Sequence, residues 1–122
     1  MRMEREPEAA GPLITGLAPN GFRIGATVLP ALTMTTERAD PWSPPPLSAL
    51  ALTDLAVLVE TTPEFILLGT GATLARPSLA LIRDLDAAGV GLEIMDSRAA
   101  ARAWGVLRSE GRIIAAAFYP LA

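Results

Sequence analysis

Two glycines directly follow an apolar run in the segment ILLGTGATLARP (66–77), a position at which a loop can bind phosphate. Gly69, Thr70 and Gly71 supply a G-x-G pattern, but Leu74 occupies the place of the third glycine of the dinucleotide-binding fingerprint. The next expected helix also begins too far downstream for its N-terminus to follow the turn directly. The pattern therefore leaves two interpretations: a tight turn, or a loop whose exposed backbone amides bind an anion.

A second polar segment, MDSRAA (95–100), follows another expected strand. Ligands of open α/β sheets bind beyond the carboxyl ends of the strands, so we expect this segment to lie beside the glycine loop. Asp96 is a candidate general base there, although an Asp directly before a helical pattern is more often a helix cap. Arg98 and Arg102 either pair with a carboxylate or phosphate or simply solvate the surface. The candidate ligand site comprises Gly69, Thr70, Gly71, Asp96, Arg98 and Arg102.

Several residue types on which enzymes depend are missing from the chain. The sequence has no Cys and no His, and its ten basic residues are all Arg. These absences exclude disulfides, zinc sites of the thiolate or imidazole type, nucleophilic Ser-His or Cys-His pairs, and Schiff-base lysines. Asp84 and Asp86 lie two positions apart on an expected helix and point to different faces, so they cannot pair as metal ligands. We expect no catalytic residues, no metal site and no cofactor.

Composition indicates the class of protein and the kind of partner. A chain of 122 residues is the size of one domain, and its net charge of −3 disfavours nucleic acid, which is bound by basic patches. Hydrophobic residues make up 51% of the chain, so we expect apolar surface to remain for a protein partner or for a second copy of the chain.

No uninterrupted apolar run reaches the roughly 20 residues that a membrane helix needs. The N-terminal segment MRMEREPEAAGP mixes charges of both signs and has no apolar region typical of a secretory signal. We therefore expect a cytoplasmic protein that is not an integral membrane protein. Its flexible N-terminal arm is expected over 1–12, and a single α/β domain over 13–122.

Helical and strand patterns alternate from residue 53 onwards. Thr53 is expected to cap a helix of about two turns, and Pro77 to occupy the first helical position of the next helix. Continuous apolar runs predict strands that are covered on both faces. The expected strands are 64–69, which should be central, 90–95 and 112–121. The expected helices follow Thr53, span 76–89, and follow a cap at Asp96 or Ser97. This alternation predicts right-handed βαβ crossovers on a largely parallel sheet.

The N-terminal part should add strands at one side of that sheet. A short strand is expected at 13–18, a turn at 19–21, and a hairpin or bulged strand pair within 22–36. The segment ERADPWSPPPL (37–47) contains four prolines, so we expect an extended connection with few hydrogen bonds, or a docking motif for proline-binding modules. Trp42 should fold back onto the body. The predicted fold is a small three-layer α/β domain with a mixed, largely parallel central sheet and an N-terminal β-hairpin.

Short motifs along the C-terminal half carry a resemblance. They are GTG (69–71), MD (95–96), a run of small residues with Arg102 and Leu107, and EGR (110–112) leading into AAA (115–117). Together they resemble a family of domains of unknown function from bacteria and archaea, whose mitochondrial relatives are known as respiratory complex I assembly factor 3. The resemblance covers about residues 12–120. It implies a three-layer α/β fold with a mixed sheet, and the family has no agreed catalytic residues or cofactor.

Two functional hypotheses follow. The first is a non-enzymatic protein-interaction or assembly factor, similar to complex I assembly factor 3, with components of respiratory-complex or membrane-complex biogenesis as its partners. Trp42 and the proline-rich segment are the candidate partner surface. The second hypothesis is a domain that binds a small anionic ligand at the C-terminal ends of the strands.

Overall fold

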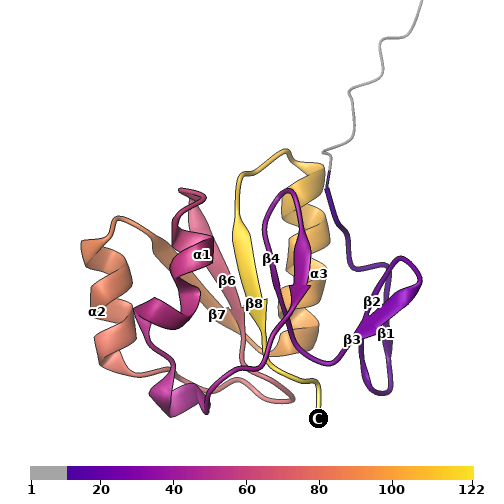
Figure 1. The fold of residues 1–122 in the computed structure, drawn as a ribbon, viewed down its shortest axis with the longest axis horizontal. Coiled ribbons are helices and arrows are strands. Elements are labelled where there is room, and N and C mark those ends of the chain that lie inside the picture. Colours follow the sequence, from indigo (N-terminus) through magenta and orange to yellow (C-terminus); the bar gives the residue numbers. More distant parts are fainter. Residues whose placement is uncertain (1–10) are drawn as a thin grey trace, which may run out of the picture.

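A mixed five-stranded sheet forms the centre of the fold in the computed structural model, which describes residues 11–122 (Figure 1). Its strands lie in the order β5 (Ala39–Pro41), β4 (Leu32–Met34), β8 (Ala115–Phe118), β6 (Phe65–Gly69) and β7 (Gly91–Met95). β6 pairs in parallel with β7 and β8, whereas β4 pairs antiparallel with β8 and β5. A separate antiparallel sheet contains β1 (Gly16–Ala18), β2 (Gly21–Ile24) and β3 (Thr27–Leu29).

Helices cover both faces of the central sheet, which gives three layers (Figure 1). One face carries two 3₁₀ turns and two helices: η1 (Leu47–Ala49), η2 (Leu52–Leu55), α1 (Ala56–Val59) and α2 (Leu79–Ala87). The other face carries α3 (Ser97–Ser109) and the small sheet. The predicted three-layer α/β fold with a mixed central sheet is confirmed. The N-terminal hairpin is extended to three strands and forms a sheet of its own, and the strands added at one side of the central sheet are β4 and β5.

Alternation along β6 explains why its sequence is apolar throughout. Leu67 packs into the core beneath α3, while Ile66 and Leu68 pack into the core beneath α1 and α2. Because β8 and β7 flank it on both sides, β6 lies inside the sheet as expected. β8 is also buried on both faces, and small side chains occupy both of them: Ala116 lies on the α3 side and Ala115 on the other.

β7 differs from the predicted second buried strand. It forms one edge of the sheet and, among the described residues, pairs only with β6. Gly91 and Glu93 are exposed, and its other residues are half-buried. The prediction of full burial is wrong because α3 lies mainly over β6, so one face of β7 is incompletely covered.

Two helix starts also differ from the predictions. Ser78, not Pro77, stands at the beginning of α2, where its hydroxyl accepts a hydrogen bond from the Leu81 amide at 3.1 Å. Thr53 does not cap a helix, because the Asp54 carboxylate reaches back to the Ala51 amide at 2.9 Å and closes a 3₁₀ turn. The α-helical part is therefore short and begins only after that turn.

The proline-rich segment is more ordered than predicted. Ala39–Pro41 forms β5, where the side chain of Arg38 pairs with that of Asp40 at 2.8 Å. Proline is tolerated there because an edge strand needs no amide on its outer side. The Trp42 ring folds back as expected and meets the Tyr119 ring edge-on, with 5.2 Å between the centroids.

The predicted N-terminal arm falls mostly on residues 1–10, which lie outside the described residues. The Pro12 carbonyl accepts a hydrogen bond from the Trp104 indole at 3.1 Å, which places Pro12 against the body of the domain. Among residues 11–122, no helix is both long and apolar enough to cross a membrane.

Candidate functional site

The glycine loop and the start of α3 meet at the carboxyl ends of β6 and β7, as the sequence predicts. Gly69 is the last residue of β6 and lies opposite Met95 in the ladder. The Thr70 amide donates to the Met95 carbonyl at 2.8 Å, and the Gly71 carbonyl accepts from the Ser97 amide at 2.8 Å. The structure therefore brings four of the six candidate residues together, namely Gly69, Thr70, Gly71 and Asp96.

The polar groups of this loop bond within the protein. The Gly71 amide donates to the Ser97 hydroxyl at 2.8 Å. The Thr70 hydroxyl accepts from the Ala75 amide at 3.1 Å and lies 2.7 Å from the Thr73 carbonyl. Since the amides of Thr70 and Gly71 both donate inside the protein, the tight-turn interpretation accounts for their positions.

Close packing explains why the loop contains glycine. A Cβ at Gly69 would lie 2.8 Å from the Ser97 hydroxyl and 3.1 Å from a ring carbon of Phe118. Gly71 has φ +106°, a conformation that side chains with a Cβ rarely adopt. Both glycines are therefore needed for the approach of the loop to α3 and β8.

Ser97 is the residue of this site that sequence reasoning underrated. Its side chain is fully buried, accepts from the Gly71 amide and donates to the Tyr119 carbonyl at 2.7 Å. One hydroxyl thus joins the segments that follow β6, β7 and β8. Sequence patterns identify Ser97 only as an alternative helix cap, because the two partners of its hydroxyl, Gly71 and Tyr119, are distant along the chain.

Asp96 caps α3. Its Oδ1 atom accepts a hydrogen bond from the Ala99 amide at 2.9 Å, which satisfies one of the unpaired amides of the first helical turn. The geometry thus matches the capping interpretation of Asp96.

Arg98 and Arg102 lie one turn apart on α3 and are exposed. Both line a small hollow of about 200 Å³ against β1, together with Ile14 and Leu17. Within residues 11–122, neither arginine side chain forms a hydrogen bond or ion pair with the glycine loop. The anion site formed by all six residues therefore stays a prediction.

A larger groove of about 450 Å³, which we call the α3 groove, lies between α3 and the strands β6 and β7. Its apolar lining comes from all three elements: Phe65, Leu67, Met95, Ala99, Ala103, Val106 and Leu107. Two charged residues, Glu93 and Arg102, also line it. Val106 is 54% exposed although it is a large apolar residue. The groove thus leaves apolar side chains accessible at the edge of the sheet, and no sequence pattern pointed to it.

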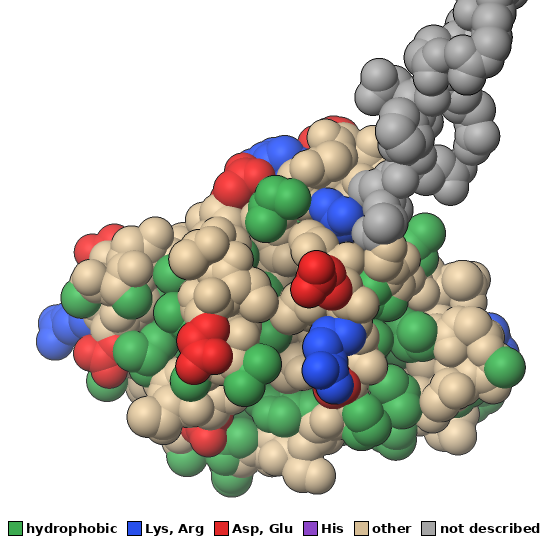
Figure 2. All heavy atoms as spheres, turned by 45° about the horizontal axis from the view of Figure 1, so that its top comes forward, with side chains coloured by type: hydrophobic (Ala, Val, Ile, Leu, Met, Phe, Trp, Pro, Cys, Tyr) green, Lys and Arg blue, Asp and Glu red, His purple; other side chains and the backbone are tan. Residues whose placement is uncertain are grey.

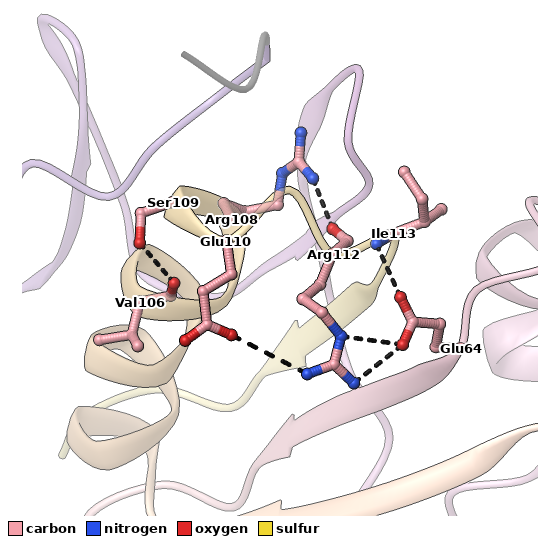
Figure 3. Close-up of polar contacts among 7 residues, drawn as sticks. All are labelled: Glu64, Val106, Arg108, Ser109, Glu110, Arg112 and Ile113. Atoms are coloured by element: carbon pink, nitrogen blue, oxygen red, sulfur yellow. Dashed lines mark hydrogen bonds and ion pairs between the residues drawn. The ribbon is translucent and has the colours of Figure 1, made fainter. Parts of the chain in front are cut away.

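A polar cluster fixes the turn between α3 and β8 beside this groove (Figure 3). The Glu64 carboxylate accepts from the Arg112 guanidinium at 2.9 Å and from the Ile113 amide at 3.2 Å. These bonds, the one from Arg112 first, hold the pKa of Glu64 below its usual value. The Arg112 guanidinium also lies 5.5 Å from the centre of the Phe65 ring. The backbone carbonyl of Arg112 accepts a hydrogen bond from the side chain of the buried Arg108.

Tyr119 holds the proline-rich segment on the opposite face. Its hydroxyl donates to the Pro45 carbonyl at 2.7 Å, while its ring contacts Trp42. Burial, and to a smaller extent the charge of Asp54, raises the pKa of Tyr119 to about 12. The partner surface predicted at Trp42 is thus a half-buried ring that is packed against the body.

On the face drawn in Figure 2, charged side chains are scattered rather than gathered in one area. Acidic and basic side chains alternate with apolar ones on the face drawn in Figure 2, without a continuous area of one sign. Among residues 11–122, no group of three or more His, Cys, Asp or Glu could hold a metal ion.

Two relatives are similar to this chain over nearly its whole length. An uncharacterised protein of Rhodobacter capsulatus is 39% identical over 121 residues, which cover 96% of this chain and 92% of the relative. The NADH dehydrogenase [ubiquinone] 1 alpha subcomplex assembly factor 3 of Danio rerio is 31% identical, over 97% of this chain and 69% of its own length.

Solved structures show the same fold. A crystal structure of a Bordetella parapertussis protein matches with a TM-score of 0.83 and 26% identity, over 93% of this chain and 99% of the other. A solution structure of a Bordetella pertussis protein, described as a Mth938-like domain, matches with a TM-score of 0.79 and 24% identity, over 100% and 94%. A family model described as a protein of unknown function matches residues 14–119. The chain therefore belongs to the DUF498/DUF598 family.

Proposed function

We propose that this chain is a non-enzymatic protein-interaction factor in the assembly of a respiratory or other membrane complex. The observation that carries the proposal is the match to the Danio rerio assembly factor, because the similarity extends over 97% of the chain. Its partners would be subunits or other biogenesis factors of such a complex. We propose that it acts in the cytoplasm, and a second copy of the chain is a further candidate partner.

Two surfaces support a binding role. The α3 groove presents apolar side chains next to an edge strand, and such accessible apolar surface is typical of interaction sites. On the other face, Trp42 and the proline-rich segment are held by Tyr119, so a partner would meet a preorganised surface there. Binding to either surface needs no reactive side chain.

Deletion of the gene in the organism that carries it tests the proposal. We expect blue-native electrophoresis of its membranes to show less mature complex I, or another respiratory complex, together with accumulated subassemblies. Re-expression of the chain should restore the mature complex. Wild-type amounts of every respiratory complex in the deletion strain would contradict an assembly role.

The alternative function, binding of a small anion at the strand ends, has weaker support. The amides of Thr70 and Gly71 donate inside the protein, and the Asp96 carboxylate at the same edge would repel an anion. A thermal-shift screen of anionic metabolites checks it: a ligand that raises the melting temperature of wild type but not of Arg102→Ala would favour the alternative.

A further inference from the structure

The two edges of the central sheet are protected very differently. β5 contains three residues, among them Pro41, and its Asp40 is paired with Arg38. Short length, proline and charge are devices that keep an edge strand from pairing with another chain. β7 contains five residues without proline, and its single charged residue, Glu93, makes no ion pair within residues 11–122. Of the two edges, as formed by residues 11–122, only β7 is therefore open to a further strand.

The open edge is continuous with the α3 groove. Glu93 and Met95 of β7 line that groove, so the face of β7 that looks toward α3 borders the apolar side chains. Val106, on the α3 wall, is more than half exposed. A strand added beside β7 would place alternate side chains on this same face, next to Val106.

The charge at the centre of β7 argues against a second copy of the chain as the occupant. β7 spans Gly91–Met95, so antiparallel pairing about a twofold axis at its middle would place the two Glu93 side chains opposite each other. Like charges directly opposite on neighbouring strands are destabilising, whereas opposite charges attract. Glu93 therefore favours a different chain that carries a basic residue at this position.

We propose that β7 binds an extended segment of a partner protein as an added edge strand. The segment places Lys or Arg opposite Glu93 and apolar residues two positions away on either side, where they cover the open side of the groove against Val106. Backbone hydrogen bonds along β7 supply affinity, and the basic and apolar side chains supply selectivity. This inference rests on the proposed interaction function and specifies its surface and partner chemistry.

A random peptide library displayed on phage and selected on the purified full-length chain provides the probe. We expect the selected peptides to share a basic residue flanked at i−2 and i+2 by apolar residues. A synthetic copy should bind Glu93→Arg about tenfold more weakly in fluorescence anisotropy, because cross-strand attraction becomes repulsion. Glu60→Arg, which changes an exposed glutamate at the end of α1, is the matched control and should bind like wild type. A peptide with Glu in place of its basic residue should restore binding to Glu93→Arg.

A second pair of variants tests the groove. Val106→Glu should weaken the peptide about tenfold or more, while Val57→Glu, at an exposed valine on the other face of the sheet, should not. Hydrogen exchange followed by mass spectrometry should show slower exchange in 91–95 when the peptide is bound. Circular dichroism verifies that each variant is folded.

Three outcomes would overturn the inference: no enriched peptide, unchanged binding to Glu93→Arg and Val106→Glu, or a concentration-dependent dimer that occupies β7. Such outcomes leave the proposed function standing if deletion of the gene still depletes a respiratory complex. A deletion strain with normal complexes, by contrast, removes the proposed function even if peptides bind β7.

Discussion

Replacement of Ser97 by alanine should destabilise the domain far more than the loss of one hydroxyl usually does. The fully buried Oγ atom accepts from the Gly71 amide and donates to the Tyr119 carbonyl, so its removal leaves two backbone groups without this partner. The bond from the Ser97 amide to the Gly71 carbonyl is retained in the variant. Each buried group left unsatisfied costs about 1–3 kcal/mol, so we expect Ser97→Ala to lower the free energy of unfolding by about 2–6 kcal/mol.

Urea denaturation followed by circular dichroism measures this loss. With an m-value of roughly 1.5 kcal/mol/M for a small domain, the midpoint should fall by about 1–4 M while the m-value is unchanged. Ser109→Ala is the matched control on the same helix, because the Ser109 hydroxyl donates at 2.6 Å to the Val106 carbonyl at an exposed position. If Ser97→Ala and Ser109→Ala have equal midpoints, the hydroxyl does not join the three strand ends as described.

Three further predictions concern other polar groups. Asp96→Ala should lower the free energy of unfolding by about 0.5–2 kcal/mol because the α3 cap is lost, whereas Asp96→Asn should retain most of it in the same urea assay. The single tyrosine, Tyr119, should ionise with a pKa of about 12 in an ultraviolet titration of the folded protein. Because the fold favours the neutral phenol, the free energy of unfolding should decline as the pH rises from about 10 through that value. A titration midpoint near 10 in the folded protein would contradict the burial of Tyr119. The pKa of Glu64 is lowered by Arg112, so this exposed pair should stabilise the fold at neutral pH. The difference in free energy of unfolding between wild type and Glu64→Gln should shrink as the pH falls below about 4, where the carboxylate becomes protonated. A difference that does not change with pH would argue against the pair.

The main architecture could be predicted from local patterns. Continuous apolar runs at 64–69 and 112–121, separated by helical patterns, correctly indicate two inner strands of the mixed sheet that pair in parallel. Gly89, with φ +77°, ends α2 as expected for a glycine at that position. These features depend on short segments, so the residues themselves carry the information.

Features that depend on distant partners could not be predicted in the same way. The run at 90–95 is mostly apolar apart from Glu93, but the exposure of the strand is decided by where α3 crosses the sheet. The Asp54 carboxylate accepts a hydrogen bond from the Ala51 amide and closes a 3₁₀ turn, so the α-helix begins after the position expected from Thr53. The α3 groove combines residues from three elements, and only their assembly shows that Val106 remains exposed.

Affinity purification of the tagged chain from its native cells, with quantitative mass spectrometry, tests the interaction function most directly. Wild type should recover a stoichiometric partner from a respiratory or other membrane complex, and the double variant Glu93→Arg, Val106→Glu should lose it. The control Glu60→Arg, Val57→Glu should recover the partner in wild-type amounts. Absence of any stoichiometric partner with wild type would contradict the proposed function, and equal recovery by both double variants would contradict binding at β7.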